Sequence, residues 1–183
     1  MPLTLTDQSS HLGRAGQFAV MAELFARGWN VSVPEVDVGD HVFVARDDAT
    51  ELTRVQVKTA TPAPSAEGRV ARFKVSADQA LRVGNVPLVF VFVVPGAASW
   101  DHFVVPQNDL LDLRRRYLTA DRGKRGRPAS SHAETWMFEV LIAAERCTAW
   151  GADLARWRND WSAFRLLTLD RGDATAPDPS RSP

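Results

Sequence analysis

The residues best equipped for chemistry lie between positions 37 and 58 of this 183-residue chain. Asp40 stands just before an apolar run, and a polar turn separates that run from Gln56 and Lys58. Since side chains alternate along a strand, we expect Gln56 and Lys58 on one face, with Val55 and Val57 in the core. A carboxylate, an amide oxygen and a lysine brought together can hold a hard divalent cation and orient water. This combination is the minimum equipment for metal-assisted phosphodiester hydrolysis.

A β-hairpin is expected to position these residues. Residues 42–46 and 52–59 both have strand character, and the short polar turn between them is typical of a hairpin. Residues 12–27 have apolar side chains at helical spacing, and Gly28 is a suitable residue to end that helix. Residues 87–94 are almost entirely apolar, which is typical of a central strand covered on both faces.

The remaining patterns predict one α/β (α+β) domain with a central mixed β-sheet flanked by helices. We expect this domain to span residues 1–168, with a loose lead-in over residues 1–10. From residue 170 onward no large apolar side chain occurs, so residues 169–183 are predicted to be a disordered tail. Other strands are expected at residues 29–33, 69–76, 102–105 and 135–142. Other helices are expected after the capping residue Ser76 and at residues 107–117 and 154–164. Loops are expected at residues 60–68 and 119–133.

The order of these motifs resembles the core of the PD-(D/E)XK nucleases, especially the small Holliday-junction resolvases and Mrr-like proteins. Proteins of that family have a helix that carries a glutamate, an aspartate on the second strand, and an acid or glutamine two residues before a lysine on the third. The resemblance covers about residues 12–95 and implies a restriction-endonuclease-like fold. Its motifs here are GRAGQFAV at residues 13–20, GWNV at 28–31, VDVGD at 36–40 and VQVK at 55–58.

The resemblance also implies a set of site residues. The helical glutamate of the family falls on Gln17, and the aspartate falls on Asp40, or on His41 if the register is one residue later. The third-strand acid falls on Gln56 and the lysine on Lys58. The implied catalytic set is therefore Asp40, Gln56, Lys58 and Gln17.

A metal site follows from the same resemblance. Asp40, Gln56 and the backbone carbonyl of Val57 would bind Mg²⁺ or Mn²⁺, and Lys58 would orient or activate the attacking water. The implied function is a Mg²⁺-dependent DNA endonuclease that acts in repair, recombination or defence.

Two other interpretations stay open from the sequence. Gln17 is neutral where the family has a negative charge, and His41 separates Asp40 from the apolar strand residues. Both features favour a nuclease-fold domain with a weakened metal site that binds nucleic acid or protein. In the third interpretation the pattern is fortuitous, and Asp40 and Lys58 belong to distant parts of an unrelated α/β domain.

Basic residues are concentrated in one part of a chain whose formal net charge is zero, with 22 basic and 22 acidic residues. Such a cluster can contact DNA phosphates through salt-sensitive electrostatic interactions. The alternative is a solvated helix end, where positive charge interacts favourably with the helix dipole. The cluster consists of Arg114, Arg115, Arg116, Arg122, Lys124, Arg125 and Arg127.

The composition limits the compartment and the partners. A single cysteine, Cys147, excludes an intramolecular disulfide and a cysteine-cluster metal site. No apolar run approaches the roughly 20 residues that a membrane span needs, and the first residues do not have the pattern of a secretory signal. We therefore expect a cytoplasmic protein with no membrane association. The resemblance and the basic cluster suggest DNA as its partner. The resemblance adds a homodimer, since relatives in this branch commonly act as dimers.

Overall fold

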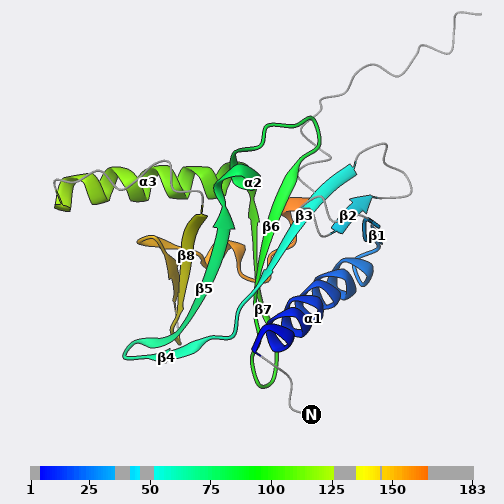
Figure 1. The fold of residues 1–183 in the computed structure, drawn as a ribbon, viewed down its shortest axis with the longest axis horizontal. Helices are drawn as coiled ribbons and strands as arrows, with labels where there is room; N and C mark the ends of the chain where they lie inside the picture. Colours follow the sequence, from blue (N-terminus) through cyan, green and yellow to red (C-terminus); the bar gives the residue numbers. More distant parts are fainter. Residues whose placement is uncertain (1–4, 36–41, 46–51, 126–134, 145, 165–183) are drawn as a thin grey trace, which may run out of the picture.

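The computed structural model describes residues 5–35, 42–45, 52–125, 135–144 and 146–164. Within this part of the chain, two five-stranded sheets pack against each other, and helices lie outside them (Figure 1). The fold is mixed α+β, as the sequence predicts, with a mixed sheet at its centre. No helix among the described residues is long and apolar enough to span a membrane.

The central sheet, called sheet A, has the strand order β1-β2-β3-β6-β7. Strands β3 and β6 are parallel, and every other neighbouring pair is antiparallel. The predicted hairpin is present, because β2 pairs antiparallel with β3. The strands are β1 (Asn30–Ser32), β2 (Val42–Ala45), β3 (Leu52–Thr59), β6 (Leu88–Val94) and β7 (Asp101–Pro106).

A second sheet, called sheet B, is entirely antiparallel and was not expected from the sequence, which predicted one central sheet. Its strand order is β10-β9-β8-β5-β4. Three of its strands have only two or three residues, too few for a clear alternation of apolar and polar side chains. The strands are β4 (Ala63–Ser65), β5 (Gly68–Ser76), β8 (Thr135–Ile142), β9 (Cys147–Ala149) and β10 (Ala152–Asp153).

Three helices accompany the sheets. Helix α1 (Leu5–Phe25) lies against β3 on the outer face of sheet A. Helix α2 (Ala77–Leu81) begins after Ser76, whose side chain accepts a hydrogen bond from the Gln79 backbone amide, so the predicted cap is confirmed. Helix α3 (Gln107–Arg125) runs along the top of the molecule and projects away from sheet A (Figure 1).

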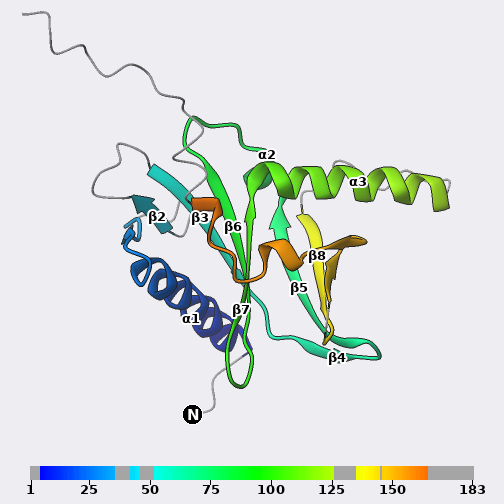
Figure 2. The same ribbon diagram turned by 180° about the vertical axis from the view of Figure 1, so that it is seen from behind.

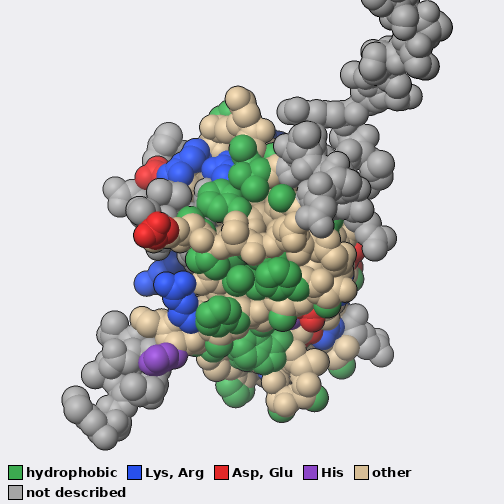
Figure 3. All heavy atoms as spheres, turned by 90° about the vertical axis from the view of Figure 1, so that its right-hand side faces the viewer, with side chains coloured by type: hydrophobic (Ala, Val, Ile, Leu, Met, Phe, Trp, Pro, Cys, Tyr) green, Lys and Arg blue, Asp and Glu red, His purple; other side chains and the backbone are tan. Residues whose placement is uncertain are grey.

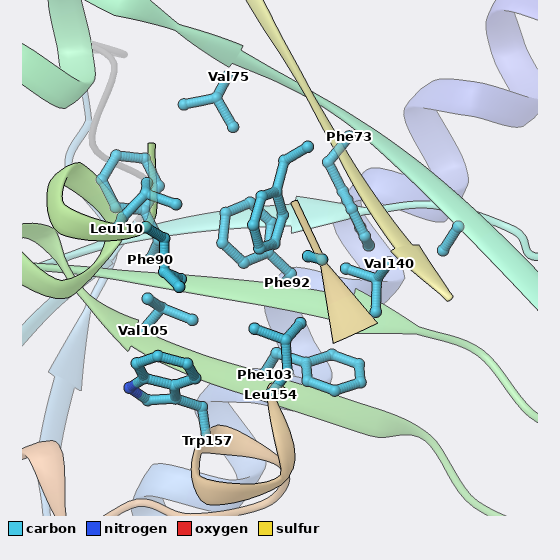
Figure 4. Close-up of a cluster of buried hydrophobic side chains, with 14 of the residues drawn as sticks. Phe73, Val75, Phe90, Phe92, Phe103, Val105, Leu110, Val140, Leu154 and Trp157 are labelled. Carbon is cyan, nitrogen blue, oxygen red and sulfur yellow. The ribbon is translucent and has the colours of Figure 1, made fainter. Parts of the chain in front are cut away.

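Two separate cores hold these layers together. The helix-side core, between α1 and sheet A, includes Val20, Leu24, Val55 and Val57. The intersheet core, between sheets A and B, is rich in phenylalanine. There, the rings of Phe73 and Phe92 have centroids 5.1 Å apart (Figure 4). Because β6 lies between the two cores, all seven of its residues are buried, which confirms the prediction of a doubly covered central strand.

The C-terminal part of the described chain differs most from the sequence prediction. Instead of a helix over residues 154–164, it contains a short 3₁₀ turn, η1 (Ala155–Trp157), followed by an isolated bridge between Phe103 and Arg158. In Figure 2 this segment crosses in front of β6 and β7. Trp157 enters the intersheet core and Trp161 enters the helix-side core. In a helix over residues 154–164, Trp157 and Trp161 would lie on one face and could not pack into two different cores. The packing of the two rings therefore excludes the predicted helix.

Both long helices also exceed their predicted lengths. Helix α1 begins at Leu5, so residues 5–10 are helical and were wrongly predicted as a loose lead-in. Helix α3 continues to Arg125, so the prediction of a loop from residue 119 is wrong as far as residue 125. Its last two turns carry polar and basic residues that give no apolar periodicity to detect. The predicted tail at residues 169–183 lies outside the described residues.

Candidate functional site

Gln56 and Lys58 lie on the same face of β3, as strand alternation predicts. In the parallel register, Gln56 is paired with Phe90 of β6, and Lys58 is paired with Phe92. Both phenylalanines belong to the intersheet core, so Gln56 and Lys58 are on the intersheet face of sheet A. The intervening Val57 belongs to the helix-side core.

The two polar side chains differ in their exposure. Gln56 is fully buried, whereas Lys58 is partly exposed at the edge of the buried region. The Gln56 Nε2 atom donates a long hydrogen bond of 3.5 Å to the Val57 carbonyl oxygen. The amide group and the carbonyl that the resemblance assigns to a metal are therefore immediate neighbours, with the lysine one residue further along.

The acidic member of the expected site cannot be placed. Asp40 and the alternative residue His41 lie outside the described residues. They directly precede β2 in the sequence, and the first residue of β2, Val42, pairs with Val55 of β3. The hairpin that was expected to bring this end of β2 to β3 is thus present.

Gln17 approaches sheet A from the other side. It is buried and shares one side of α1 with Val20 and Leu24, which belong to the helix-side core. Its Oε1 atom accepts a hydrogen bond of 2.9 Å from Arg14 Nη1. The structure therefore brings Gln56 and Lys58 together on the intersheet face but leaves Gln17 on the helix-side face.

The described residues fit a hard divalent cation only in part. Gln56 and the Val57 carbonyl offer neutral oxygen atoms, which are the type of ligand that Mg²⁺ accepts. However, the described part of the chain contains no group of three His, Cys, Asp or Glu residues that could hold a metal ion. A complete site needs a carboxylate from outside the described residues, and Asp40 is the residue that the sequence offers.

The basic cluster lies along α3, away from β3. The Arg114 guanidinium lies over the rings of Tyr117, Trp136 and Trp150, at 5.6, 5.4 and 5.3 Å from their centroids. Burial lowers the pKa of Arg114. Its position among three aromatic rings assigns it to packing between α3 and sheet B rather than to a free basic surface.

The other members of the cluster are more exposed or are not described. Arg115 forms an ion pair with Asp112 of the same helix. Arg116 is exposed and lines a groove of about 310 Å³ between α3 and η1. The side chains of Arg122, Lys124 and Arg125, in the last turns of α3, and all of Arg127 lie outside the described part of the chain. Since α3 projects away from sheet A (Figures 1 and 2), the described members of the cluster, Arg114, Arg115 and Arg116, do not adjoin β3.

The sequence analysis missed a buried carboxylate at the start of β7. Asp101 accepts a hydrogen bond of 2.9 Å from Arg158 Nε, and Arg69 Nη2 lies 3.6 Å from its other oxygen. The hydrogen bond to Asp101 raises the pKa of Arg158. This network ties the C-terminal segment to both sheets, so its role is structural. The only sign of this buried network in the sequence was an acidic residue, Asp101, at the start of an apolar strand.

The described architecture is similar to that of a known endonuclease. A bacterial homing endonuclease, I-Ssp6803I, superposes with a TM-score of 0.50 over 87% of this chain and 93% of that chain. The sequence identity is 16%, so the likeness concerns the fold. No known protein family matches the sequence, and no curated protein matches it either. The described fold is thus similar to the fold of this homing endonuclease.

Proposed function

We propose that this chain is a metal-dependent DNA endonuclease of the PD-(D/E)XK type that hydrolyses phosphodiester bonds. The observation that carries the proposal is the placement of Gln56 and Lys58 side by side on β3, within an endonuclease fold. Support also comes from the β2–β3 hairpin, because Asp40 precedes β2 by two residues.

Each residue has a distinct role in this proposal. Asp40, Gln56 and the Val57 carbonyl hold Mg²⁺ or Mn²⁺. The bound ion would lower the pKa of a water molecule and polarise the phosphate. Lys58, whose side chain is partly exposed, orients the attacking water. The leaving group is a sugar oxygen. Gln17 lies on the helix-side face and is left outside the metal set.

DNA is the proposed partner, and the end of α3 offers contacts outside the cleavage site. Arg116 is exposed in the middle of α3, and Arg122, Lys124, Arg125 and Arg127 follow in the sequence. Because the chain as a whole has no net charge, these clustered basic residues would supply most of the electrostatic attraction. We expect DNA affinity to fall steeply with salt concentration. The cytoplasm as location and a homodimer as active form belong to the same proposal.

The experiment that tests this function is a cleavage assay on supercoiled, linear and four-way-junction DNA. The protein is incubated with each substrate in Mg²⁺, in Mn²⁺ and in EDTA, and the products are separated on gels. The proposal predicts cleavage of at least one substrate in the presence of metal and none in EDTA. If the folded protein cleaves none of the substrates with either metal, the proposal is wrong.

A second function is favoured by specific observations. Both Gln17 and Gln56 are neutral and buried, and the described residues contain no group of acidic or histidine ligands for a metal. These features suit a nuclease-fold domain that binds nucleic acid or protein without cutting it. DNA binding in a gel-shift assay, combined with no cleavage under any metal condition, would favour this alternative.

A further inference from the structure

Helix α1 is apolar on two sides, although only one side contacts the sheet. On the inner side, Val20 and Leu24 are fully buried in the helix-side core. On the outer side, Phe18 is 63% exposed and Phe25 is 53% exposed. Figure 3 shows hydrophobic side chains gathered on the side of the molecule where α1 lies. A helix that is hydrophobic all round is normally covered on all sides.

The outer residues form a regular stripe. Ala15, Phe18, Ala22 and Phe25 are all exposed and are spaced by three, four and three residues. This is the spacing of the first and fourth positions of successive heptads, which form the contact line of packed helices. We refer to these four residues as the α1 stripe. No charged residue belongs to it.

The α1 stripe is complementary to itself when it is reversed. Along the chain, its residues are small, large, small and large. In the opposite direction the order is large, small, large and small. In an antiparallel pair of identical helices, each phenylalanine therefore lies opposite an alanine, and large side chains fill the spaces beside small ones. A pairing of this kind has twofold symmetry, which is the commonest symmetry of protein dimers.

We propose that the occupant of the α1 stripe is a second copy of this chain, bound through antiparallel α1 helices. Phe18 packs on Ala22 of the second copy, and Phe25 packs on Ala15 of the second copy. The twofold axis passes between the two helices at the level of position 20, midway between Ala15 and Phe25. The adjoining positions Leu12, Ala19, Met21 and Ala26 are also apolar and widen the contact.

The charges near the stripe do not oppose this pairing. Arg27 forms an ion pair with Glu23 within the same helix. Arg14 donates a hydrogen bond to Gln17 on the inner side. The stripe itself has no basic residue to attract nucleic acid, so DNA is not the occupant favoured by its chemistry. A homodimer is already part of the proposed function, whereas this interface rests on the α1 stripe alone, so a failed cleavage assay would not overturn it.

Sedimentation velocity of the full chain tests the proposal. We expect the wild-type protein to form dimers that dissociate on dilution to about micromolar concentration, as suits a small interface. Ala22→Arg places a charge in the middle of the contact at an exposed helical position and should give a monomer. Val83→Arg is the matched control, because Val83 is 96% exposed and lies outside α1. This control should remain dimeric. Circular dichroism establishes that both variants are folded.

Cysteine cross-linking tests the antiparallel register independently. In the double variant Ala15→Cys with Phe25→Cys, the two cysteines of one helix are about 15 Å apart, too far for a disulfide within the chain. The proposal predicts that oxidation gives a covalent dimer of the double variant and none of either single variant. The natural Cys147 is buried.

Three results would overturn the inference. The first is a wild-type protein that stays monomeric up to roughly 200 µM. The second is a dimer that survives Ala22→Arg. The third is efficient cross-linking of the Ala15→Cys or Phe25→Cys single variant, which would indicate parallel helices.

Discussion

Gly16 of α1 lies directly against Thr59 of β3, the residue after Lys58. A Cβ atom at position 16 would stand 2.9 Å from the Thr59 Cβ and closer still to its Oγ1. Thr59 is short and β-branched, so it cannot turn away as a long side chain could. The absence of a side chain at position 16 therefore sets how closely α1 approaches the strand that carries Gln56 and Lys58.

Gly16→Ala should destabilise the protein by about 1–3 kcal/mol, because α1 and β3 must move apart. Gly13→Ala on the same helix is the matched control, since a Cβ atom there meets nothing within 4 Å. This control should stabilise the protein by about 0.5–1 kcal/mol through helix propensity. Urea denaturation measures both changes. Equal effects at the two positions would show that the close approach does not exist.

Arg114 provides a second test, because its position in the basic cluster suggested DNA contact but the structure places it among aromatic rings. Arg114→Ala should lower the free energy of unfolding by about 1–2 kcal/mol, since three ring contacts are lost. Arg115→Ala removes only a surface ion pair and should change stability by less than about 0.5 kcal/mol. If Arg114→Ala has no effect on stability, the ring contacts do not form in solution.

His102 should make stability depend on pH. It is buried beside Trp161, and burial lowers its pKa. Arg27 acts in the same direction, whereas Glu23 and Asp101 partly oppose it. In the unfolded chain the imidazole takes up a proton below about pH 6.5. The folded protein takes it up only at a lower pH, so the free energy of unfolding should fall as pH decreases from 6.5 towards the folded pKa.

Urea denaturation at several pH values, compared between wild type and His102→Phe, isolates this contribution. The variant cannot titrate at position 102, so its stability should fall less steeply below about pH 6.5. His11→Gln is the control for removing a histidine at an exposed position. A variant with the full wild-type slope would show that another group is responsible.

Much of the part of sheet A around the candidate site could be predicted from the sequence. The hairpin, the alternation of Gln56 and Lys58 with valines, and the doubly buried strand β6 all follow from local patterns of apolar and polar residues. Such patterns record which face of an element is buried. The similarity to an endonuclease fold was expected from the order of the same motifs.

Other features depend on contacts between distant parts of the chain and could not be predicted. Strands β9 and β10 exist because they pair beside β8, and their few residues have no periodicity of their own. The spacing of Trp157 and Trp161 fits a helix, yet the two rings enter different cores. The sequence resemblance places Gln17 in the active site, but only the packing of α1 shows on which face of sheet A it lies.

Single-turnover DNA cleavage by Lys58→Ala tests the central claim most directly. Lys74→Ala is the matched control, since Lys74 is an exposed lysine on strand β5 of sheet B. Both variants are first compared with the wild type for folding and for DNA affinity. The account predicts that metal-dependent cleavage by Lys58→Ala falls by about 100-fold or more, while Lys74→Ala cleaves at the wild-type rate. Wild-type cleavage by folded Lys58→Ala would contradict the assignment of the active site to β3.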